Sequence, residues 1–512
     1  MNGLAGAVKA WLAGRAAKPI GIWVLALGAC MTLGFAPFGL WPVAILSLAG
    51  LWALVRHAQN TKQAVGAALV WGVGHQVTAL YWLPWAFFKD ADGSWVAAIF
   101  GGIPAVLGLA VYGALAYMLA CGVAWRVGKR FGWGYASVLF VILWVAIEFV
   151  KGLHPMGFPW LPVGAIFASS LVLMQGAALG GVWLLSALGL IIAVLLGGGR
   201  GRWQVATAVG IVAVMAAGGS MRLAMAGKAT GAPVDMIRVV QPDIQSEHKW
   251  DPQKRWDFLQ QTLAVALAGD PSQTTPQTVI MPETAVAFYL DEEEDVRRAI
   301  TSRIAARLPA HGALVTGTVR RDADPETFMD HYYNSLAVMD TDGVLRGVYD
   351  KRFLVPFGEY IPGREWMERL PLPVPLRTLS QSRIDFTHGT RSPVLSTPAG
   401  DAVGLICYEG IFPLQVAEAA QGARYLINIT NDSWFTGTIA LYQHAALARL
   451  RSVETGLPLV RVTNTGLTQV VDGMGRIVAQ LPINTPTYAD VILPAVQPPT
   501  PFLRSIDWFM SR

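Results

Sequence analysis

The sequence has little charge for its length. Only 14% of its 512 residues are charged, whereas 53% are hydrophobic. A water-soluble chain of this size needs far more charged surface than that. The shortage of charge therefore predicts that part of the protein lies in lipid.

Long basic blocks and paired cysteines are also missing. The net charge is only +5, and no run of lysine and arginine is long enough for a nucleic-acid-binding patch, so nucleic-acid binding is excluded. The three cysteines, Cys30, Cys121 and Cys407, form no close pair. Neither a disulfide framework nor a zinc site is therefore expected, and Cys407 has to be judged by itself.

The apolar residues are concentrated before about residue 221. Between Pro19 and Phe88 the only formal charges are Arg56 and Lys62, which no water-facing helix pattern shows. Because about 20 apolar residues span a bilayer, the sequence predicts seven spans, at 20–36, 40–55, 64–86, 96–123, 134–151, 178–198 and 203–221.

The basic residues of the loops predict the orientation of these spans. Lysine and arginine mark cytoplasmic loops, so we place the N-terminus, with Lys9, Arg15 and Lys18, inside. The alternation then puts seven further basic residues on the same side: Arg56, Lys62, Arg126, Lys129, Arg130, Arg200 and Arg202. Seven crossings leave everything after Arg222 outside the cytoplasm.

Two features of the membrane part need separate interpretation. The apolar stretch at 157–174 is interrupted by Pro159 and Pro162, so we expect a re-entrant or interfacial segment and not an eighth span. Glu148 lies within the fifth span, where a carboxylate often marks a functional site. Since Lys151 follows at i+3, we expect a simple ion pair near the helix end.

The remainder has the composition of a globular α/β domain. We expect a transmembrane helical domain at 1–221, a linker at 222–233, a catalytic domain at 234–495 and a C-terminal tail at 496–512. Strand-like runs occur at 236–240, 278–281, 313–318, 335–339, 344–349, 402–407, 425–430, 459–463 and 468–471. Helical patterns occur at 252–268, 291–307, 412–421 and 439–455. Turn residues at 340–343 and 472–475 predict hairpins, and the mixture favours a layered fold with two sheets.

Three segments of this domain place reactive groups at strand ends. An apolar strand leads to Pro282 and Glu283, and a charged, aromatic segment at 349–360 contains Lys351. A third strand ends in Cys407, and a helix begins soon afterwards. This is the layout of a nucleophile elbow, in which the next backbone N–H groups face a developing oxyanion.

Each of these groups also has an ordinary structural interpretation. A lone cysteine after an apolar strand is most often a small buried hydrophobe. A glutamate after a strand is usually a solvated turn residue, and a lysine in a charge run usually lies on the surface. Together, however, a thiol, a carboxylate and an amine on three strand ends are the groups needed for covalent acyl transfer.

In these contexts the three residues resemble the Glu-Lys-Cys triad of the nitrilase superfamily, and the whole chain resembles the apolipoprotein N-acyltransferases. The resemblance extends to MGFPW at 156–160, QPDI at 241–244, YNS at 333–335, NDSWF at 431–435, QH at 443–444 and TNTG at 463–466. It implies a multi-pass α-helical membrane domain followed by a nitrilase-like α-β-β-α sandwich. It also implies that Glu283, Lys351 and Cys407 are catalytic, with Glu359, Tyr408, Glu409 and Asn334 in supporting roles.

The resemblance further implies a reaction and a location. An acyl chain would pass from a phospholipid to Cys407, and from this thioester to the N-terminal amino group of a diacylglyceryl apolipoprotein, with no cofactor and no metal. We expect a monomer in the bacterial inner membrane, with its catalytic domain on the periplasmic side. One alternative is a membrane-bound amidase or thioesterase with water as the acceptor. A transporter with a binding module is a second, although no pair of interrupted spans recurs in two halves.

The end of the sequence departs from the family pattern. Family members usually continue into another transmembrane helix after a Thr-Pro-aromatic-x-x-Arg segment. Here Thr500 to Arg504 fit that segment, and only Ser505 to Arg512 follow. We therefore expect a tail that lacks the usual last transmembrane helix, with Trp508, Phe509 and Met510 resting in the membrane interface.

Overall fold

The structure is a computed structural model that describes residues 18–90, 94–153, 157–199, 201–226, 235–244, 253–269, 275–305, 307–323, 330–367, 369 and 385–510. Lys9, Arg15, Met156, Arg200 and most of the predicted linker lie outside these ranges. The chain forms two compact units. The first comprises Met1–Trp85 and Gly101–Met225, and the second comprises Ala86–Phe100 and Ala226–Arg512.

The first unit is helical, and a long helix overlaps each of the seven predicted spans. These helices are α2 (Lys18–Thr32), α3 (Trp41–His57), α4 (Thr61–Leu80), α7 (Ile103–Phe131), α8 (Trp133–Lys151), α9 (Ala177–Gly197) and α10 (Arg202–Met225). The helical stretches that contain α7, α8, α9 and α10 are long and apolar enough to cross a membrane, whereas α2 and α3 are shorter apolar helices. The number of crossings stays a prediction.

The helix boundaries in the structure differ most from the predicted ones near the third and fourth spans. Helix α4 ends at Leu80, and a separate helix, α5 (Leu83–Asp90), follows. The short helix α6 (Trp95–Ala97) and the π-helical turn η1 (Ala98–Gly102) then lead to α7. At the other end of the unit, α10 continues to Met225, beyond the predicted start of the linker.

The apolar stretch at 157–174 contains no long helix. Two short 3₁₀ helices lie in this region, η2 (Val163–Ser169) and η3 (Leu173–Gly176). Pro162 immediately precedes η2, and η2 is buried up to Ala168. Because proline cannot donate a backbone hydrogen bond, a continuous helix is not formed here.

The expected ion pair between Glu148 and Lys151 is wrong. Among the described residues, no salt bridge joins the carboxylate of Glu148 to the ammonium of Lys151. The Oε1 atom of Glu148 instead accepts hydrogen bonds from the Nε1 of Trp144, at 3.1 Å, and from the backbone N–H of Val163, at 2.8 Å. The Nζ of Lys151 lies over the ring of Tyr117, 5.3 Å from its centre.

The second unit contains two β-sheets. The seven-stranded sheet has the order β13-β1-β2-β4-β5-β6, with β3 paired to β4, and the six-stranded sheet has the order β12-β11-β10-β9-β8-β7. The first sheet consists of β1 (Met236–Gln241), β2 (Thr278–Ile280), β3 (Val286–Tyr289), β4 (Ala313–Ala323), β5 (Asp330–Asp340), β6 (Leu345–Asp350) and β13 (Thr487–Ile492). The second consists of β7 (Val394–Thr397), β8 (Gly400–Ile406), β9 (Tyr425–Thr430), β10 (Leu459–Thr463), β11 (Gln469–Val471) and β12 (Ile477–Gln480).

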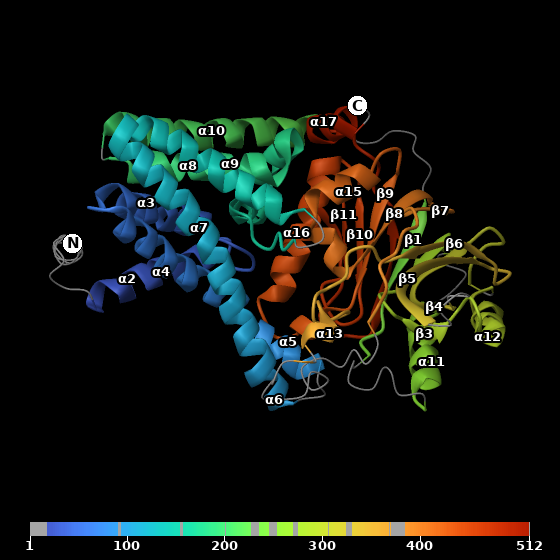
Figure 1. The fold of residues 1–512 in the computed structure, drawn as a ribbon. Helices are drawn as coiled ribbons and strands as arrows, with labels where there is room; N and C mark the ends of the chain where they lie inside the picture. Colours follow the sequence, from blue (N-terminus) through green and yellow to red (C-terminus); the bar gives the residue numbers. More distant parts are fainter. Residues whose placement is uncertain are drawn as a thin grey trace. The chain divides into compact units, whose positions relative to one another are not determined.

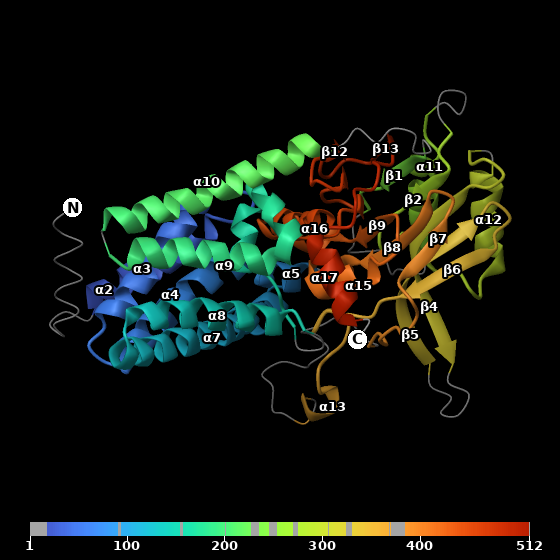
Figure 2. The same cartoon turned by 90° about the horizontal axis from the view of Figure 1, so that it is seen from above.

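The two sheets pack face to face and carry helices on their outer faces. Alternate residues of a strand point to opposite faces. Ile237 and Val239 of β1 therefore meet Ile427 and Ile429 of β9 in one buried apolar cluster, while Val240 belongs to the cluster under the helices. Those helices are α11 (Arg255–Ala266) and α12 (Glu294–Ile304) on the first sheet, and α15 (Pro413–Ala419) and α16 (Ala440–Thr455) on the second (Figures 1 and 2). The predicted α-β-β-α sandwich is confirmed.

Each strand-like run of the sequence lies on a strand, and both predicted turns join antiparallel neighbours, β5 to β6 and β11 to β12. The strands that were not predicted are β3, β7, β12 and β13. Strands β7 and β12 lie at the edges of their sheet, and with four residues each they are too short to show an alternating pattern. Two short helices were not predicted either, α13 (Arg364–Met367) and α17 (Pro501–Met510).

Helix α17 lies in the predicted tail. Phe502 and Leu503 are buried, whereas Trp508, Phe509 and Met510 are exposed. The Oγ1 of Thr500 accepts a hydrogen bond from the N–H of Leu503, at 3.1 Å, which caps the first turn. Contact of the exposed end with lipid stays a prediction.

Candidate active site

Cys407 lies at a sharp turn between a strand and a helix. Strand β8 ends at Ile406, and the 3₁₀ helix η5 (Cys407–Ile411) follows directly. The φ angle of Cys407 is +51°, a left-handed conformation that costs a non-glycine residue about 1 kcal/mol or more. Such strain persists only where the surroundings hold it, and it often marks a functional site.

Glu283 follows strand β2 and is bound on both carboxylate oxygens. Its Oε1 accepts a hydrogen bond from the Nδ2 of Asn334, at 2.7 Å, and its Oε2 accepts one from the backbone N–H of Asn431, at 2.8 Å. Asn431 follows β9 of the other sheet, so this carboxylate joins the two sheets.

The backbone around Glu283 lies very close to strand β4. A Cβ atom added to Gly317 would lie 2.3 Å from the backbone N of Thr284 and 2.6 Å from the Cα of Glu283. The N–H of Gly317 also donates to the carbonyl of Pro282, at 3.2 Å. Only glycine permits this approach, which fixes where the carboxylate lies.

Lys351 follows strand β6 and is almost completely buried. Its backbone N–H donates to the carbonyl of Asn334, at 2.8 Å. Its Nζ lies 2.9 Å from Oε1 and 2.8 Å from Oε2 of Glu359, and 3.8 Å from Oε1 of Glu283. The side chain is only 1% exposed, so these carboxylates replace water around the ammonium group.

Asn334, on strand β5, joins the two carboxylates. Its Nδ2 donates to Oε1 of Glu283, at 2.7 Å, and to Oε1 of Glu359, at 2.8 Å. The Oε2 of Glu359 also accepts the backbone N–H of Val355, at 2.8 Å. Two carboxyl groups therefore share one ammonium and one amide.

Glu409 connects the Lys351 segment to the Cys407 turn. Its Oε1 accepts hydrogen bonds from the hydroxyl of Tyr349, at 2.6 Å, and from the backbone N–H groups of Arg352 and Phe353, at 2.8 and 3.1 Å. Its Oε2 accepts the N–H of Ile406, at 2.8 Å. Glu409 therefore positions two of the three reactive groups relative to each other.

Burial and charge set the protonation of the thiol and the amine. Burial, together with the charge of Glu283, raises the pKa of Cys407 well above its usual range. For Lys351, burial opposes the charged form, but Glu359 and Glu283 outweigh it and raise its pKa. At neutral pH the site therefore holds a neutral thiol beside a permanent cation, and nucleophilic attack by the thiol requires a base.

The remaining predicted residues lie within the same region. Tyr408 is buried in η5, and its ring packs edge-on against Phe412, with 4.9 Å between the ring centres.

Among the residues that the structure describes, no group of three or more His, Cys, Asp or Glu side chains is arranged to hold a metal ion.

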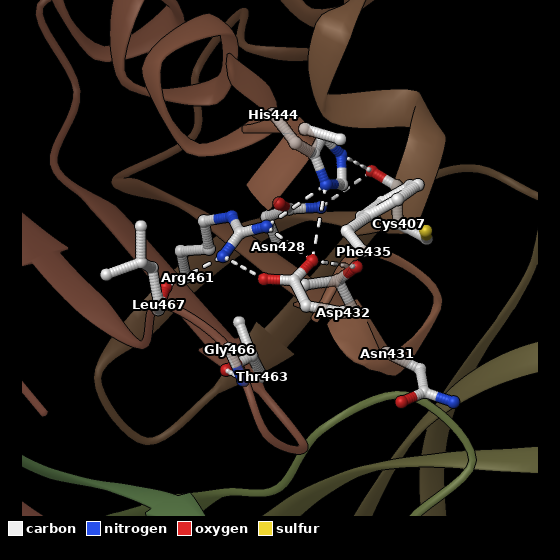
Figure 3. A network of polar contacts seen from close by, with 12 residues as sticks. Cys407, Asn428, Asn431, Asp432, Phe435, His444, Arg461, Thr463, Gly466 and Leu467 are labelled. Carbon is white, nitrogen blue, oxygen red and sulfur yellow. Dashed lines mark hydrogen bonds and ion pairs between the residues drawn. The ribbon is translucent and has the colours of Figure 1, made fainter. Parts of the chain in front are cut away.

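A buried network behind Cys407 was not predicted (Figure 3). It consists of Asn428, Asp432, His444 and Arg461, all with almost no exposed surface. The sequence shows two of these residues only as parts of the NDSWF and QH motifs, without a role. One local feature could have indicated the network, namely a charged residue within a strongly apolar segment, such as Arg461 in β10. A charge buried in such a strand needs a partner of its own.

The arrangement places a thiol, a carboxylate that interacts with it electrostatically and a buried cation in one site. These are the components of covalent catalysis through an acyl-enzyme. They come from the ends of β2, β6 and β8, the three strand ends that the sequence singles out.

The chain is similar to two known protein families and to several named proteins. The family model described as carbon-nitrogen hydrolase matches residues 236–500, and the one described as apolipoprotein N-acyltransferase N-terminal domain matches residues 27–195. The apolipoprotein N-acyltransferase of Rhodopseudomonas palustris is 34% identical over 98% of this chain and 93% of its own length. That of Brucella melitensis is 30% identical over 98% of this chain and 92% of its own length. The crystal structure of an amidase from Nesterenkonia sp. is 19% identical, covers 56% of this chain and 98% of its own, and has a TM-score of 0.36.

Proposed function

We propose that this chain, which belongs to the apolipoprotein N-acyltransferase family, carries an acyl group on Cys407 between a phospholipid donor and an apolipoprotein acceptor. One observation carries the proposal. A strained cysteine, a buried carboxylate and a buried ammonium interact electrostatically within one site, at 283, 351 and 407. A binding module has no need of that combination.

In the first half-reaction the sulfur of Cys407 attacks an ester carbonyl of the phospholipid. Glu283 takes the thiol proton, and the ammonium of Lys351 and the backbone N–H of Tyr408 stabilise the tetrahedral oxyanion. The ester C–O bond then breaks. Glu283 returns the proton to the leaving alkoxide, so lysophospholipid departs and a thioester remains.

In the second half-reaction the free α-amino group of a diacylglyceryl-cysteine attacks the thioester. Glu283 takes a proton from the amine, the C–S bond breaks, and the thiol of Cys407 recovers its proton. The product is an amide. Because a thioester is more reactive than an amide, the step needs no external energy source, and two substrates that use one thiol in turn give ping-pong kinetics.

The environment of each group supports its proposed role. The raised pKa of Cys407 means that the thiol is neutral at rest and needs a base. Glu283 interacts electrostatically with that thiol, and both of its oxygens are fixed by N–H donors. The raised pKa of Lys351 keeps its charge throughout the cycle, as stabilisation of an oxyanion requires.

The location of the reaction follows from the same proposal. Both substrates hold acyl chains in a bilayer, and the protein is a membrane protein. The basic residues of its loops support an orientation with the catalytic unit outside the cytoplasm. We place it in the inner membrane of a bacterium, with that unit facing the periplasm. All of the reactive groups come from one chain, which supports a monomer.

Intact-mass analysis tests the chemistry. Purified protein mixed with phospholipid should gain one acyl group on Cys407, and a diacylglyceryl peptide added afterwards should remove it as an N-acyl peptide. Cys407→Ala should gain nothing. If the adduct forms but disappears at the same rate without the peptide, water is the acceptor and the enzyme is a thioesterase or amidase. If no adduct forms, the covalent mechanism is wrong.

Reporter fusions test the orientation separately. A reporter fused after Gly231 should be extracytoplasmic, and one fused at Gly128 should be cytoplasmic. The same compartment for both reporters would contradict the predicted orientation.

A further inference from the structure

The backbone carbonyl of Cys407 is held by two side chains that the proposed mechanism does not use. The Nε2 of His444 lies 3.3 Å from this oxygen, and the Nδ2 of Asn428 donates to it at 3.2 Å. Both side chains are buried, with 1% and 0% of their surface exposed. Figure 3 shows both contacts on the carbonyl, with the sulfur of Cys407 pointing away from the network.

Arg461 determines which nitrogen of His444 carries the proton. The Nη2 of Arg461 lies 3.1 Å from the Nδ1 of His444, and a guanidinium can only donate. The Oδ1 of Asp432 lies farther from Nδ1, at 3.4 Å, and already accepts a hydrogen bond from the same Nη2, at 2.9 Å. The guanidinium is therefore the nearer partner of Nδ1, which accepts from it, and the hydrogen of the neutral imidazole is assigned to Nε2. Burial lowers the pKa of His444 and favours the neutral ring, and the charge of Arg461 acts in the same direction, although the contact with Asp432 opposes them. The Nε2–H then donates to the carbonyl of Cys407, whereas the other tautomer would direct a lone pair at that oxygen.

Arg461 is itself held in place by a carboxylate. Its Nη1 and Nη2 each donate to one oxygen of Asp432, both at 2.9 Å, and its Nη1 also donates to the carbonyl of Leu467, at 2.7 Å. A bidentate pair of this kind fixes the plane of the guanidinium. A Cβ atom on Gly466 would lie 2.2 Å from Oδ2 of Asp432, so the carboxylate fits closely between its neighbours.

We propose that His444 and Asn428 are positioning residues that aim the backbone N–H of Tyr408 at the oxyanion. The carbonyl of Cys407 and the N–H of Tyr408 belong to one planar trans peptide, in which the two groups point in opposite directions. Two donors on the carbonyl side therefore fix the direction of the N–H on the other side. They also stabilise the left-handed conformation of Cys407 on which that direction depends. This inference rests on the proposed function, since it concerns the oxyanion of acyl transfer.

Two reactions of Cys407 separate aiming from general structural support. Acyl loading passes through an oxyanion. Alkylation by iodoacetamide does not, because the sulfur displaces iodide from a saturated carbon. A residue that aims the N–H of Tyr408 should affect the first reaction and not the second.

We therefore compare His444→Leu, which removes the donor, with His444→Gln, whose amide nitrogen keeps a donor at a similar reach. His444→Leu should slow loading from phospholipid by about tenfold to a hundredfold, somewhat less than complete loss of an oxyanion donor. It should leave the rate of alkylation within about twofold of wild type. His444→Gln should recover most of the loading rate. Thr455→Val, which removes a buried hydroxyl from the same helix, serves as the control for packing and should change neither rate.

Loading of His444→Leu at the wild-type rate would overturn the inference, and so would an equal fall in loading and alkylation. A p-nitrophenyl ester provides a second acyl donor that also forms an oxyanion. If wild-type protein is loaded by this ester but not by phospholipid, the proposed acyl donor is wrong. The rates at which the ester loads His444→Leu and His444→Gln then still decide the role of His444.

Discussion

The ammonium of Lys351 lies closer to Glu359 than to the carboxylate proposed as the base. The separations are 2.8 Å to Oε2 of Glu359 and 3.8 Å to Oε1 of Glu283. Glu359 therefore holds the ammonium in position. Glu283 makes only the longer contact with it, so its carboxylate is less tightly engaged, as suits a group proposed to accept a proton.

Glu359→Gln should destabilise the protein as well as slow acyl transfer. The single oxygen of an amide cannot serve Lys351, Asn334 and Val355 together, and its NH₂ group would face one of these donors. We expect a loss of about 3 kcal/mol in the free energy of unfolding, at the low end for breaking a buried ion pair, because Glu283 remains near the ammonium. Denaturant unfolding in detergent measures it. Glu292→Gln, at an exposed pair with Arg321, is the control and should have little effect.

Glu283→Gln should slow the formation of the acyl adduct before any acceptor is added. The amide cannot accept the thiol proton, so single-turnover loading with labelled phospholipid should fall by about 10²–10⁴. If loading is normal and only transfer to the peptide is slow, Glu283 is not the base of the first step.

The same variant should shift the alkylation of Cys407 in the opposite sense. Burial and the charge of Glu283 both raise the pKa of the thiol, so removing that charge lowers the pKa. The pH profile of iodoacetamide modification should therefore move to lower pH in Glu283→Gln, although acyl transfer is worse. An unchanged or upward-shifted profile would mean that Glu283 does not act on the thiol.

Gly317→Ala should misplace Glu283. The three atoms nearest to the added Cβ are all backbone atoms of residues 282–284, which cannot rotate away. A displacement of about 1 Å costs about a hundredfold in rate. Gly347→Ala is the matched control on the same sheet, since its Cβ would meet only the Cδ2 of Leu395, at 2.9 Å. Steady-state acyl transfer and thermal unfolding of both variants test this expectation.

Much of the fold could be predicted because apolar periodicity is a local property. The alternation at 236–240 and 425–430 indicates strands, and the turns at 340–343 and 472–475 indicate how strands pair. Edge strands such as β12 (Ile477–Gln480) were missed because they are short. In β12 three apolar residues follow one another without alternation, and four residues are too few to show the period of a strand.

The contacts of the site could not be predicted, since they join residues that are distant in sequence. Glu283 meets the backbone of Asn431 only because two sheets pack together. The tautomer of His444 depends on Arg461, which lies on another element. Local spacing can even mislead. At Glu148 the i+3 lysine predicts an ion pair, yet the indole of Trp144 and the backbone of Val163 bind the carboxylate instead.

The proposed base and the cation belong to the seven-stranded sheet, whereas the nucleophile belongs to the six-stranded sheet. A newly made chain that has assembled only one sheet therefore has no working set of groups. Its thiol would lack both the carboxylate proposed to remove its proton and the cation proposed to stabilise the oxyanion. Acyl transfer is therefore expected only from chains in which both sheets have formed and packed together.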